Sequence, residues 1–526
     1  MQKIRFLLLL FVALPLMAQN SSFDDFKKQQ NDKFNQFKAD QQAEFDAFRK
    51  KMNEEYAEFM RKSWESFPAH EAEKPKAEKT LPPVVYEAPK PQPAPASQPK
   101  PIDKPQSQPS AEKSQPSLAT KPQPTPQPTV APQPIAVKPK VAVVPPPPPT
   151  PEPIAPVKPK EDPYKKVSFG YFGSTITIGF PQNDNLKLRA LEENAIADAW
   201  KKLSDSRYDI TVSTALNARK NQTLCDWAYM KMLQTATEKQ YGKTNEAVLM
   251  QAFLMTQSGY RIRLGMSNTK LYMLVASLYD IFNMNYYLLD GTKFYNITGE
   301  KNINMQICKA KYGKEKSLSL QITRLPNLTN TPTSKRTLTS KKGVAASASV
   351  NKNLIDFFNT YPQACFNGDQ NTRWAAYANT PLEKSITDML YPPLKRTING
   401  MSEREAVGIL LNWVQTAFEY GYDDQIWGGD RAFFAQETLY YPYCDCEDRA
   451  ILFSRIVRDL VGLDVVLLYY PGHLAAAVAF NENVNGDYLT YKNRKYIVCD
   501  PTYINAGVGC TMPNMNNKEA QVIALK

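Results

Sequence analysis

Two columns of aromatic side chains recur at a fixed interval near the start of the chain. One column consists of Phe23, Phe34, Phe45 and Tyr56, and the other consists of Phe26, Phe37, Phe48 and Phe59. An eleven-residue repeat corresponds to about 3.67 residues per helical turn, so both columns lie on one helix face and favour a right-handed supercoil. We expect residues 19–67 to form a long helix that self-associates as a coiled coil through residues 23–67. Docking on another envelope protein and a solvated single helix are the alternatives.

The C-terminal part of the chain shows helical and then strand periodicity. Ser402, with Glu405 three residues later, has the pattern of a capping box and predicts a helix through AVGILLNWVQTAFEYG. A second helical set, which stops before Gly462, consists of Ala450, Ile451, Ile456, Val457, Leu460 and Val461. The runs DVVLLYY, HLAAAVAF, DYLTY and KYIVCDPTY then predict strands, the first two joined by a Pro471-Gly472 turn. The predicted layout is α+β, a helix followed by an antiparallel sheet.

Proline separates these two regions. Residues 68–163 contain 30 of the 42 prolines and no glycine. Such a segment cannot bury a core, and it favours an extended, semi-rigid polyproline II spacer that is otherwise disordered. Two globular parts follow, an α/β domain over residues 164–325 and a second domain over residues 351–526, divided by a polar linker over residues 326–350.

The first residues predict export. Lys3 and Arg5 precede an apolar run that ends at Leu16, and a small-residue cleavage point follows, so residues 1–18 resemble a signal peptide. The apolar run is too short for a stable membrane span, and no second long run occurs. We therefore expect an exported protein, periplasmic or secreted. The net charge of +12 is scattered along the chain, which argues against nucleic-acid binding.

Three residues of the last domain carry the candidate chemistry. Cys446 lies in the first turn of a predicted helix, where the backbone dipole favours a thiolate. His473 opens a predicted strand and is the only imidazole of the body, because His70 lies in the proline-rich segment. Asp500 closes the next long strand. Antiparallel neighbours would place this carboxylate beside the imidazole and fix its orientation.

Other uses of these cysteines are open. The seven cysteines allow up to three disulfides, and Cys446 could pair with Cys444 or Cys499. A zinc site from Cys444, Cys446, His473 and Cys499 is a further alternative, although a C-x-C pair is closer than the usual ligand spacing. The C-x-x-C of thioredoxin-like proteins does not occur, and neither does a D-x-D-x-D-G calcium loop. We expect no metal and no cofactor.

The motifs CEDRAIL, GHLAAAV and YIVCDPTY resemble those of the transglutaminase-like cysteine-enzyme superfamily, over about residues 400–515. That family has C-x-D-x-A at a helix start, a histidine opening one strand and Asp-Pro ending the next. The resemblance implies a papain-like core with Cys446 as nucleophile, His473 as base and Asp500 as the orienting carboxylate. It also implies a bacterial exported cysteine peptidase or amidase. The chain departs from the family's H-x-W pattern at Leu474 and Ala475.

Weaker candidates lie in the loop before the motif. Gln436 could donate a hydrogen bond to an oxyanion, and Trp427, Asp430 and Arg431 could contact the substrate.

The sequence of the first globular part resembles that of the second: Ala247 to Gly259 and Ala450 to Gly462 have the same spacing. This alignment puts Lys270 at the position of His473 and Lys243 at that of Cys446, so residues 164–325 could be a related module without the chemistry.

The predicted substrate is a peptide or protein amide. Water as the second substrate gives hydrolysis, whereas an amine gives a cross-linking acyltransferase. A non-catalytic envelope scaffold, in which the helix oligomerises and the last domain only binds a peptide, is the competing interpretation. A stalked energy-coupling protein is a third interpretation, and it would require an uncleaved N-terminal anchor.

Overall fold

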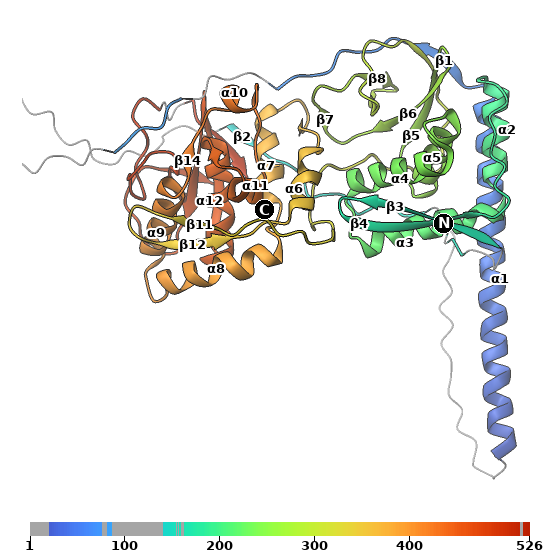
Figure 1. Cartoon of the computed structure of the whole chain (residues 1–526), viewed down its shortest axis with the longest axis horizontal. Coiled ribbons are helices and arrows are strands. Elements are labelled where there is room, and N and C mark those ends of the chain that lie inside the picture. The colour runs from blue at the N-terminus through green and yellow to red at the C-terminus, as the bar shows by residue number, and fades with distance from the viewer. Residues whose placement is uncertain are drawn as a thin grey trace, which may run out of the picture.

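The structure of the chain is a computed structural model that describes residues 20–75, 81–86, 140–153, 155, 157–158, 163–515 and 519–526. The predicted signal peptide and the middle of the predicted proline spacer lie outside these residues. The described elements form a long helix and two α/β halves, which Figure 1 shows side by side. The mixed α+β class expected from the sequence is confirmed.

The first helix, α1 (Asn20–Met60), spans 41 residues of the eleven-residue repeat. The predicted helix over residues 19–67 is wrong at its end, because Trp64–Phe67 form a strand that pairs with the sheet of the first half. Its C-terminal part packs along α2 (Glu193–Leu203), whereas its N-terminal part extends away from the body (Figure 1). Tyr56 is buried at this contact, with its ring 5.0 Å from the ring of Trp200 and 5.3 Å from that of Tyr312. Burial of large aromatic rings is the main stabilising contribution of such a contact.

Polar groups also fix α1 on the body. Arg49 Nη2 lies 2.6 Å from Asp209 Oδ2 in a buried ion pair. Asn53 Oδ1 accepts hydrogen bonds from the indole N–H of Trp200 (3.2 Å) and from Nε2 of Gln257 (2.9 Å). Because each of these groups is satisfied only when the helix is docked, they select one position of α1 on the first half.

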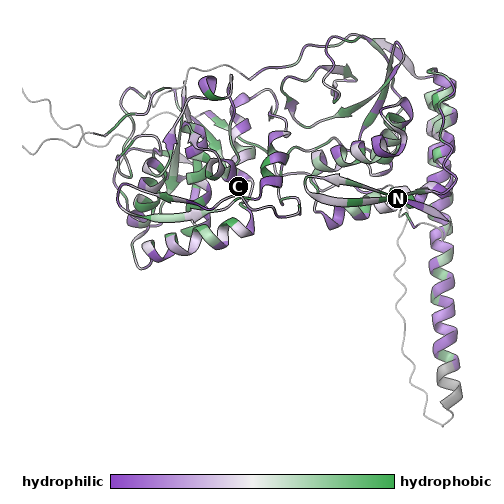
Figure 2. Ribbon diagram, in the orientation of Figure 1, coloured by the Kyte–Doolittle hydropathy of each residue, from purple (hydrophilic) through white to green (hydrophobic). Residues whose placement is uncertain are grey.

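Most rings of the two aromatic columns of α1 are exposed, including Phe34 of the first column at 56%. Tyr56 closes the first column and is 3% exposed. All four members of the second column are at least 45% exposed: Phe26, Phe37, Phe48 and Phe59. Figure 2 shows α1 as a mainly hydrophilic helix, so these rings form an isolated apolar row on it. The self-association expected of this row stays a prediction.

The first half is built on a six-stranded sheet. The helix α5 (Asn245–Gln257) packs on the middle strands of this sheet, α2 packs on α5, and α3 (Asp209–Asn221) and α4 (Asp226–Tyr241) pack on the hairpin beside the sheet. Its strands, from one edge to the other, are β1 (Trp64–Phe67), β10 (Met305–Cys308), β5 (Ile262–Ser267), β6 (Lys270–Ala276), β9 (Thr292–Asn296) and β8 (Tyr286–Leu289). Beside it lie the hairpin β3 (Tyr164–Tyr171) and β4 (Ser174–Pro181), and the short pair β7 (Asp280–Ile281) and β13 (Ala364–Cys365).

The second half has its own six-stranded sheet. Its strands, in spatial order, are β2 (Lys140–Ala142), β20 (Gln521–Ala524), β16 (Asp464–Tyr470), β17 (His473–Ala479), β19 (Arg494–Cys499) and β18 (Tyr488–Tyr491). Its helices are α6 (Lys352–Asn359), α7 (Arg373–Asn379), α8 (Lys384–Ile398), α9 (Glu403–Thr416), α10 (Asp423–Ile426), α11 (Ala435–Tyr440) and α12 (Cys446–Leu460). A parallel pair joins β14 (Glu419–Tyr420) to β15 (Tyr443–Cys444).

Local signals placed the main elements of this half correctly. The capping box is present at the start of α9, where Ser402 Oγ accepts from the N–H of Glu405 and Glu405 Oε2 accepts from the N–H of Ser402. Gly462, at a φ of 76°, ends the helical stretch after α12. The predicted strands appear as β16, β17, β18 and β19, in antiparallel order.

The two sheets have the same connectivity. In chain order, β1, β5, β6, β8, β9 and β10 occupy the spatial positions of β2, β16, β17, β18, β19 and β20. The β5–β6 hairpin of the first half pairs Ser267 with Lys270, and the β16–β17 hairpin of the second half pairs Tyr470 with His473. Lys270 therefore has the hairpin position of His473. One difference is the edge strand, which is antiparallel in β1 and parallel in β2. That residues 164–325 form a module related to the last domain, but without its chemistry, stays a prediction. The shared strand order supports it.

Parts of the expected spacer and linker pair with the body instead. β2 adds to β20, and backbone hydrogen bonds link Tyr86 to Ile504 and His70 to Tyr286. These positions interrupt the proline pattern, so their N–H groups can join strands. Residues 326–350 also contain a hairpin of β11 (Arg336–Thr339) and β12 (Ala345–Ala348), which alternating side chains make possible. Within the described part of the chain, no helix is long and apolar enough to cross a bilayer.

Replacement of the buried ring in α1 tests the docking. We expect Tyr56→Ala to lower the free energy of unfolding by about 3 kcal/mol, because it removes a packed aromatic ring. Phe59→Ala, three residues away in the exposed column, should change it by less than about 0.5 kcal/mol. Urea unfolding of both full-length variants measures the difference. Equal losses in the two variants would contradict the docked position of α1.

Candidate active site

The start of α12 holds Cys446 in place. Cys446 is the first residue of the helix and is 3% exposed. Asp448 reaches back so that its Oδ2 accepts from the backbone N–H of Asp445 (3.2 Å), and its Oδ1 accepts from the N–H of Phe433 (2.8 Å). One carboxylate thus satisfies a free helix-terminal N–H and ties the preceding loop to the helix.

A tight hairpin positions His473. Tyr470 pairs with His473 across the two-residue turn, and Gly472 there has a φ of 77°, which favours glycine. β19 pairs with β17 up to Cys499, so Asp500 leaves the sheet next to the imidazole. His473 Nε2 lies 2.8 Å from Asp500 Oδ2, and both side chains are buried.

Asp500 is itself held by three neighbours. Its Oδ1 accepts from the backbone N–H groups of Thr502 (2.8 Å) and Tyr503 (3.2 Å). Gln415 Nε2 lies within 3.1 Å of the carbonyl oxygens of Asp500, Tyr503 and Ala506. Both carboxylate oxygens and the turn after them are therefore fixed. No local sequence motif indicated the contacts of Gln415.

Only one of the two imidazole nitrogens of His473 has a hydrogen-bond partner among the described residues. Because a carboxylate accepts hydrogen bonds, Nε2 donates in this pair, and in the neutral ring Nδ1 is then the acceptor. Nδ1 has no hydrogen-bond partner among the described residues. His473 and Cys446 line one cleft with a volume of about 540 Å³. The structure thus joins His473 to Asp500 and places His473 and Cys446 on one cleft.

The thiol has an environment that opposes ionisation. Burial raises the pKa of Cys446 well above its usual value, and the carboxylates of Glu447 and Asp445 raise it further. The Cys446 thiol donates to Glu447 Oε2 at 3.1 Å. A hydrogen bond from the N–H of Leu474 lowers the pKa, but to a smaller extent. The thiolate expected from the helix dipole alone is therefore not favoured, since burial and two acidic neighbours outweigh the dipole.

A buried group of carboxyls lies behind the thiol. Oxygen atoms of Asp423, Asp445 and Asp448 lie within 4.8 Å of one another. Burial raises the pKa of Asp445 and Asp448 well above the usual range, and repulsion among the carboxylates adds to it. Such oxygens are ligands that hard cations prefer. Among the described residues, no group of candidate ligands joins Cys444, Cys446, His473 and Cys499, the set considered for zinc.

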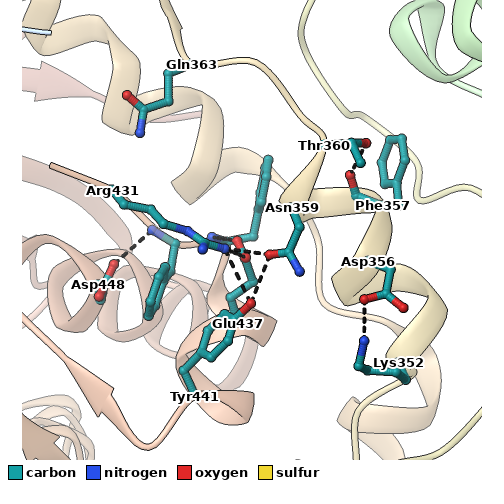
Figure 3. Close-up of polar contacts among 12 residues, drawn as sticks. Lys352, Asp356, Phe357, Asn359, Thr360, Gln363, Arg431, Glu437, Tyr441 and Asp448 are labelled. Atoms are coloured by element: carbon teal, nitrogen blue, oxygen red, sulfur yellow. Dashed lines mark hydrogen bonds and ion pairs between the residues drawn. The ribbon is translucent and has the colours of Figure 1, made fainter. Parts of the chain in front are cut away.

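The loop candidates have different positions. Asp430 lines the cleft and pairs with Arg373 at 2.7 Å. Trp427 and Arg431 pack beside the cleft, with the guanidinium 4.4 Å from the indole ring centre. Figure 3 shows Arg431 reaching Glu437 and Asn359, at 2.9 and 2.6 Å. Arg431 thereby joins the loop to α11 and α6.

Gln436 and the other cysteines lie apart from the cleft. Gln436 Oε1 accepts from the N–H of Glu383 (3.1 Å), and the residue is not among those that line the cleft. Its oxyanion role stays a prediction. The Cys444 thiol faces the carbonyl of Glu419 (3.7 Å) across the β14–β15 pair. All seven cysteines are unpaired, so the disulfides that the sequence allowed do not form.

Other residues of the cleft had no sequence signal. Trp374 stacks on Tyr469 with ring centres 5.4 Å apart, and both line the cleft together with Tyr422. Trp374 comes from α7, about seventy residues before the motif. These rings supply an aromatic wall near the position where the H-x-W pattern is missing, and only the fold could reveal it.

Comparison of the chain with protein-family models, with curated proteins and with solved structures finds no match. The function of this cleft is therefore inferred from its geometry and from the sequence motifs.

Removal of the acidic neighbour tests the electrostatics of the thiol. We expect Glu447→Gln to lower the pKa of Cys446, because the repelling charge beside the thiolate is lost. The pH profile of Cys446 alkylation by iodoacetamide should shift to lower pH, with a severalfold faster reaction at pH 7. Glu419→Gln, an exposed glutamate on β14, is the control and should leave the profile unchanged. An unchanged profile in Glu447→Gln would contradict the charge argument.

Proposed function

We propose that the cleft is the active site of a cysteine peptidase or amidase that acts through Cys446, His473 and Asp500. The observation that carries this proposal is the state of the imidazole. Nε2 is bound to Asp500, whereas Nδ1 has no partner in the part of the chain that the structure describes, and His473 lines the same cleft as Cys446. A buried histidine with a purely structural role would be expected to use both nitrogens.

In the first step, His473 Nδ1 accepts the proton of Cys446, and the sulfur attacks the carbonyl carbon of an amide. The C–N bond breaks, and the leaving amine takes the proton from the imidazolium. A thioester between Cys446 and the acyl group remains. Asp500 holds the ring and stabilises its positive charge. Because the pKa of the thiol is raised, proton transfer to His473 accompanies the attack, and no stored thiolate is needed.

In the second step, His473 removes a proton from water, which attacks the thioester. A carboxylic acid leaves, and the sulfur regains its proton from the imidazolium. An amine in place of water would give a new amide, so a cross-linking acyltransferase is the alternative outcome. We favour hydrolysis, as the resemblance to bacterial members of the transglutaminase-like superfamily implies.

The papain-like core and the export of the protein belong to the same proposal. α12 packs on β16 and β17, and it presents Cys446 toward the strand that His473 opens. This order of helix, strand and strand supports the resemblance, together with the C-x-D-x-A and Asp-Pro motifs. The signal peptide lies outside the described residues, and the periplasmic or secreted location rests on the sequence alone.

A peptide-based electrophile tests the nucleophile. We expect a peptidyl acyloxymethyl ketone to label Cys446 in the full-length protein, as mapped by mass spectrometry. His473→Ala should slow the labelling about 10²-fold or more, the usual contribution of a general base. Cys510→Ala, which changes a thiol that does not line the cleft, should leave it unchanged. Equal labelling with and without His473 would reject the enzyme and favour the scaffold alternative.

We propose in addition that two copies of the chain associate through the exposed column of α1. Phe37→Asp should shift the protein to a smaller assembly in sedimentation, because a charge in the apolar row opposes its burial. Ala39→Asp adds the same charge about 200° around the helix and is the control. Identical masses for the parent chain and both variants would contradict this contact.

A further inference from the structure

Residues 81–86, which the sequence assigned to the spacer, run from the cleft of the second half to the loop that follows Asp500. The N–H of Leu81 donates to the carbonyl of Gly472 at 3.0 Å, and Gly472 directly precedes His473. The hydroxyl of Tyr420 donates to the carbonyl of Leu81 at 3.3 Å. Pro82 lines the cleft together with Cys446 and His473. One end of this segment is therefore bound beside the candidate base.

The other end is bound in the loop that follows Asp500. The N–H of Ile504 donates to the carbonyl of Val84, and the N–H of Tyr86 donates to the carbonyl of Ile504, both at 2.8 Å. Val85 and Ile504 form a parallel bridge. The segment is thus held by backbone hydrogen bonds, as a strand is held at the edge of a sheet.

Its side chains alternate as those of a bound strand do. Val84 and Tyr86 pack on an apolar cluster of Tyr503, Ala506 and Met512, and the rings of Tyr86 and Tyr503 lie 5.7 Å apart. Val85, between them, is 59% exposed. The groove therefore recognises an extended backbone at two points and an apolar side chain at alternate positions.

We propose that the groove between Gly472 and Ile504 is the binding site for an extended, apolar peptide substrate, and that residues 81–86 occupy it as a tethered ligand. This inference rests on the proposed function, because it names the substrate class of that cleft. A segment on the same chain acts at an effective concentration of about a millimolar, so it competes with free peptide even when its own affinity is modest. An added substrate must displace it.

The test uses the full chain with Cys446→Ala, so that binding is measured without reaction. The probe is the peptide Leu-Pro-Pro-Val-Val-Tyr, labelled with fluorescein and amidated, and the readout is fluorescence anisotropy. Val84→Asp places a charge in the apolar cluster and should release the segment. Leu81→Pro, a second variant, removes the N–H that donates to Gly472. Val85→Asp is the matched control, because this side chain is exposed.

We expect Val84→Asp and Leu81→Pro to bind the probe at least about tenfold more tightly than the parent chain, with Val85→Asp unchanged. Equal binding by parent and released variants, or no binding by any of them, would overturn the inference. Labelling of Cys446 by the electrophile is a separate readout. A reactive Cys446 without peptide binding rejects the groove alone, and peptide binding with an inert Cys446 rejects the enzyme alone.

Discussion

The hydrogen bond between His473 and Asp500 depends on the register of three strands. β16 and β17 pair without a bulge from their two-residue turn onward, and β17 pairs with β19 up to the residue before Asp500. A slip of one residue would turn the carboxylate to the opposite face of the sheet. The contacts of Thr502 and Tyr503 then hold a carboxylate whose position the sheet has already determined, and Gln415 holds the backbone carbonyl of the same residue. The geometry of the cleft is therefore a property of the whole second half.

The surroundings of the Cys446 thiol oppose its ionisation, whereas those of Asp500 hold its carboxylate in place. Its position at the end of α12 follows from local capping, but its neighbours Glu447 and Asp445 make its ionisation costly. A residue in such a site reacts only when another group takes its proton at the moment of attack. Because the thiol needs a proton acceptor, Nδ1 of His473, which has no partner among the described residues, is the critical atom of the proposed active site. The opposed ionisation also explains why the Cys446 thiol can remain reduced and unpaired although Cys444 is only two residues away.

Sequence reasoning succeeded where a local pattern determines the structure. Ser402 with Glu405, Gly462 and the alternating runs of the last domain each placed an element, and the order of Cys446, His473 and Asp500 anticipated their meeting. It could not find Trp374 or Arg373, because they reach the cleft from a distant helix without periodic relation to the motif. It also treated residues 81–86 and 140–142 as spacer. Proline content describes what a segment cannot do by itself, whereas an existing strand edge can still bind the few N–H groups that remain.

The shared connectivity of the two sheets has a consequence for how the chain tolerates change. At the hairpin position of His473, the first half carries Lys270, whose ammonium is exposed and pairs with Glu300 at 2.7 Å. A lysine side chain offers N–H donors to a partner, so this position of the first half does not repeat the His473–Asp500 contact. Substitution at Lys270 would remove a surface ion pair, whereas substitution at His473 would remove a buried contact on which the order of the cleft depends. The same strand connectivity thus carries contacts of very different cost at its corresponding hairpins.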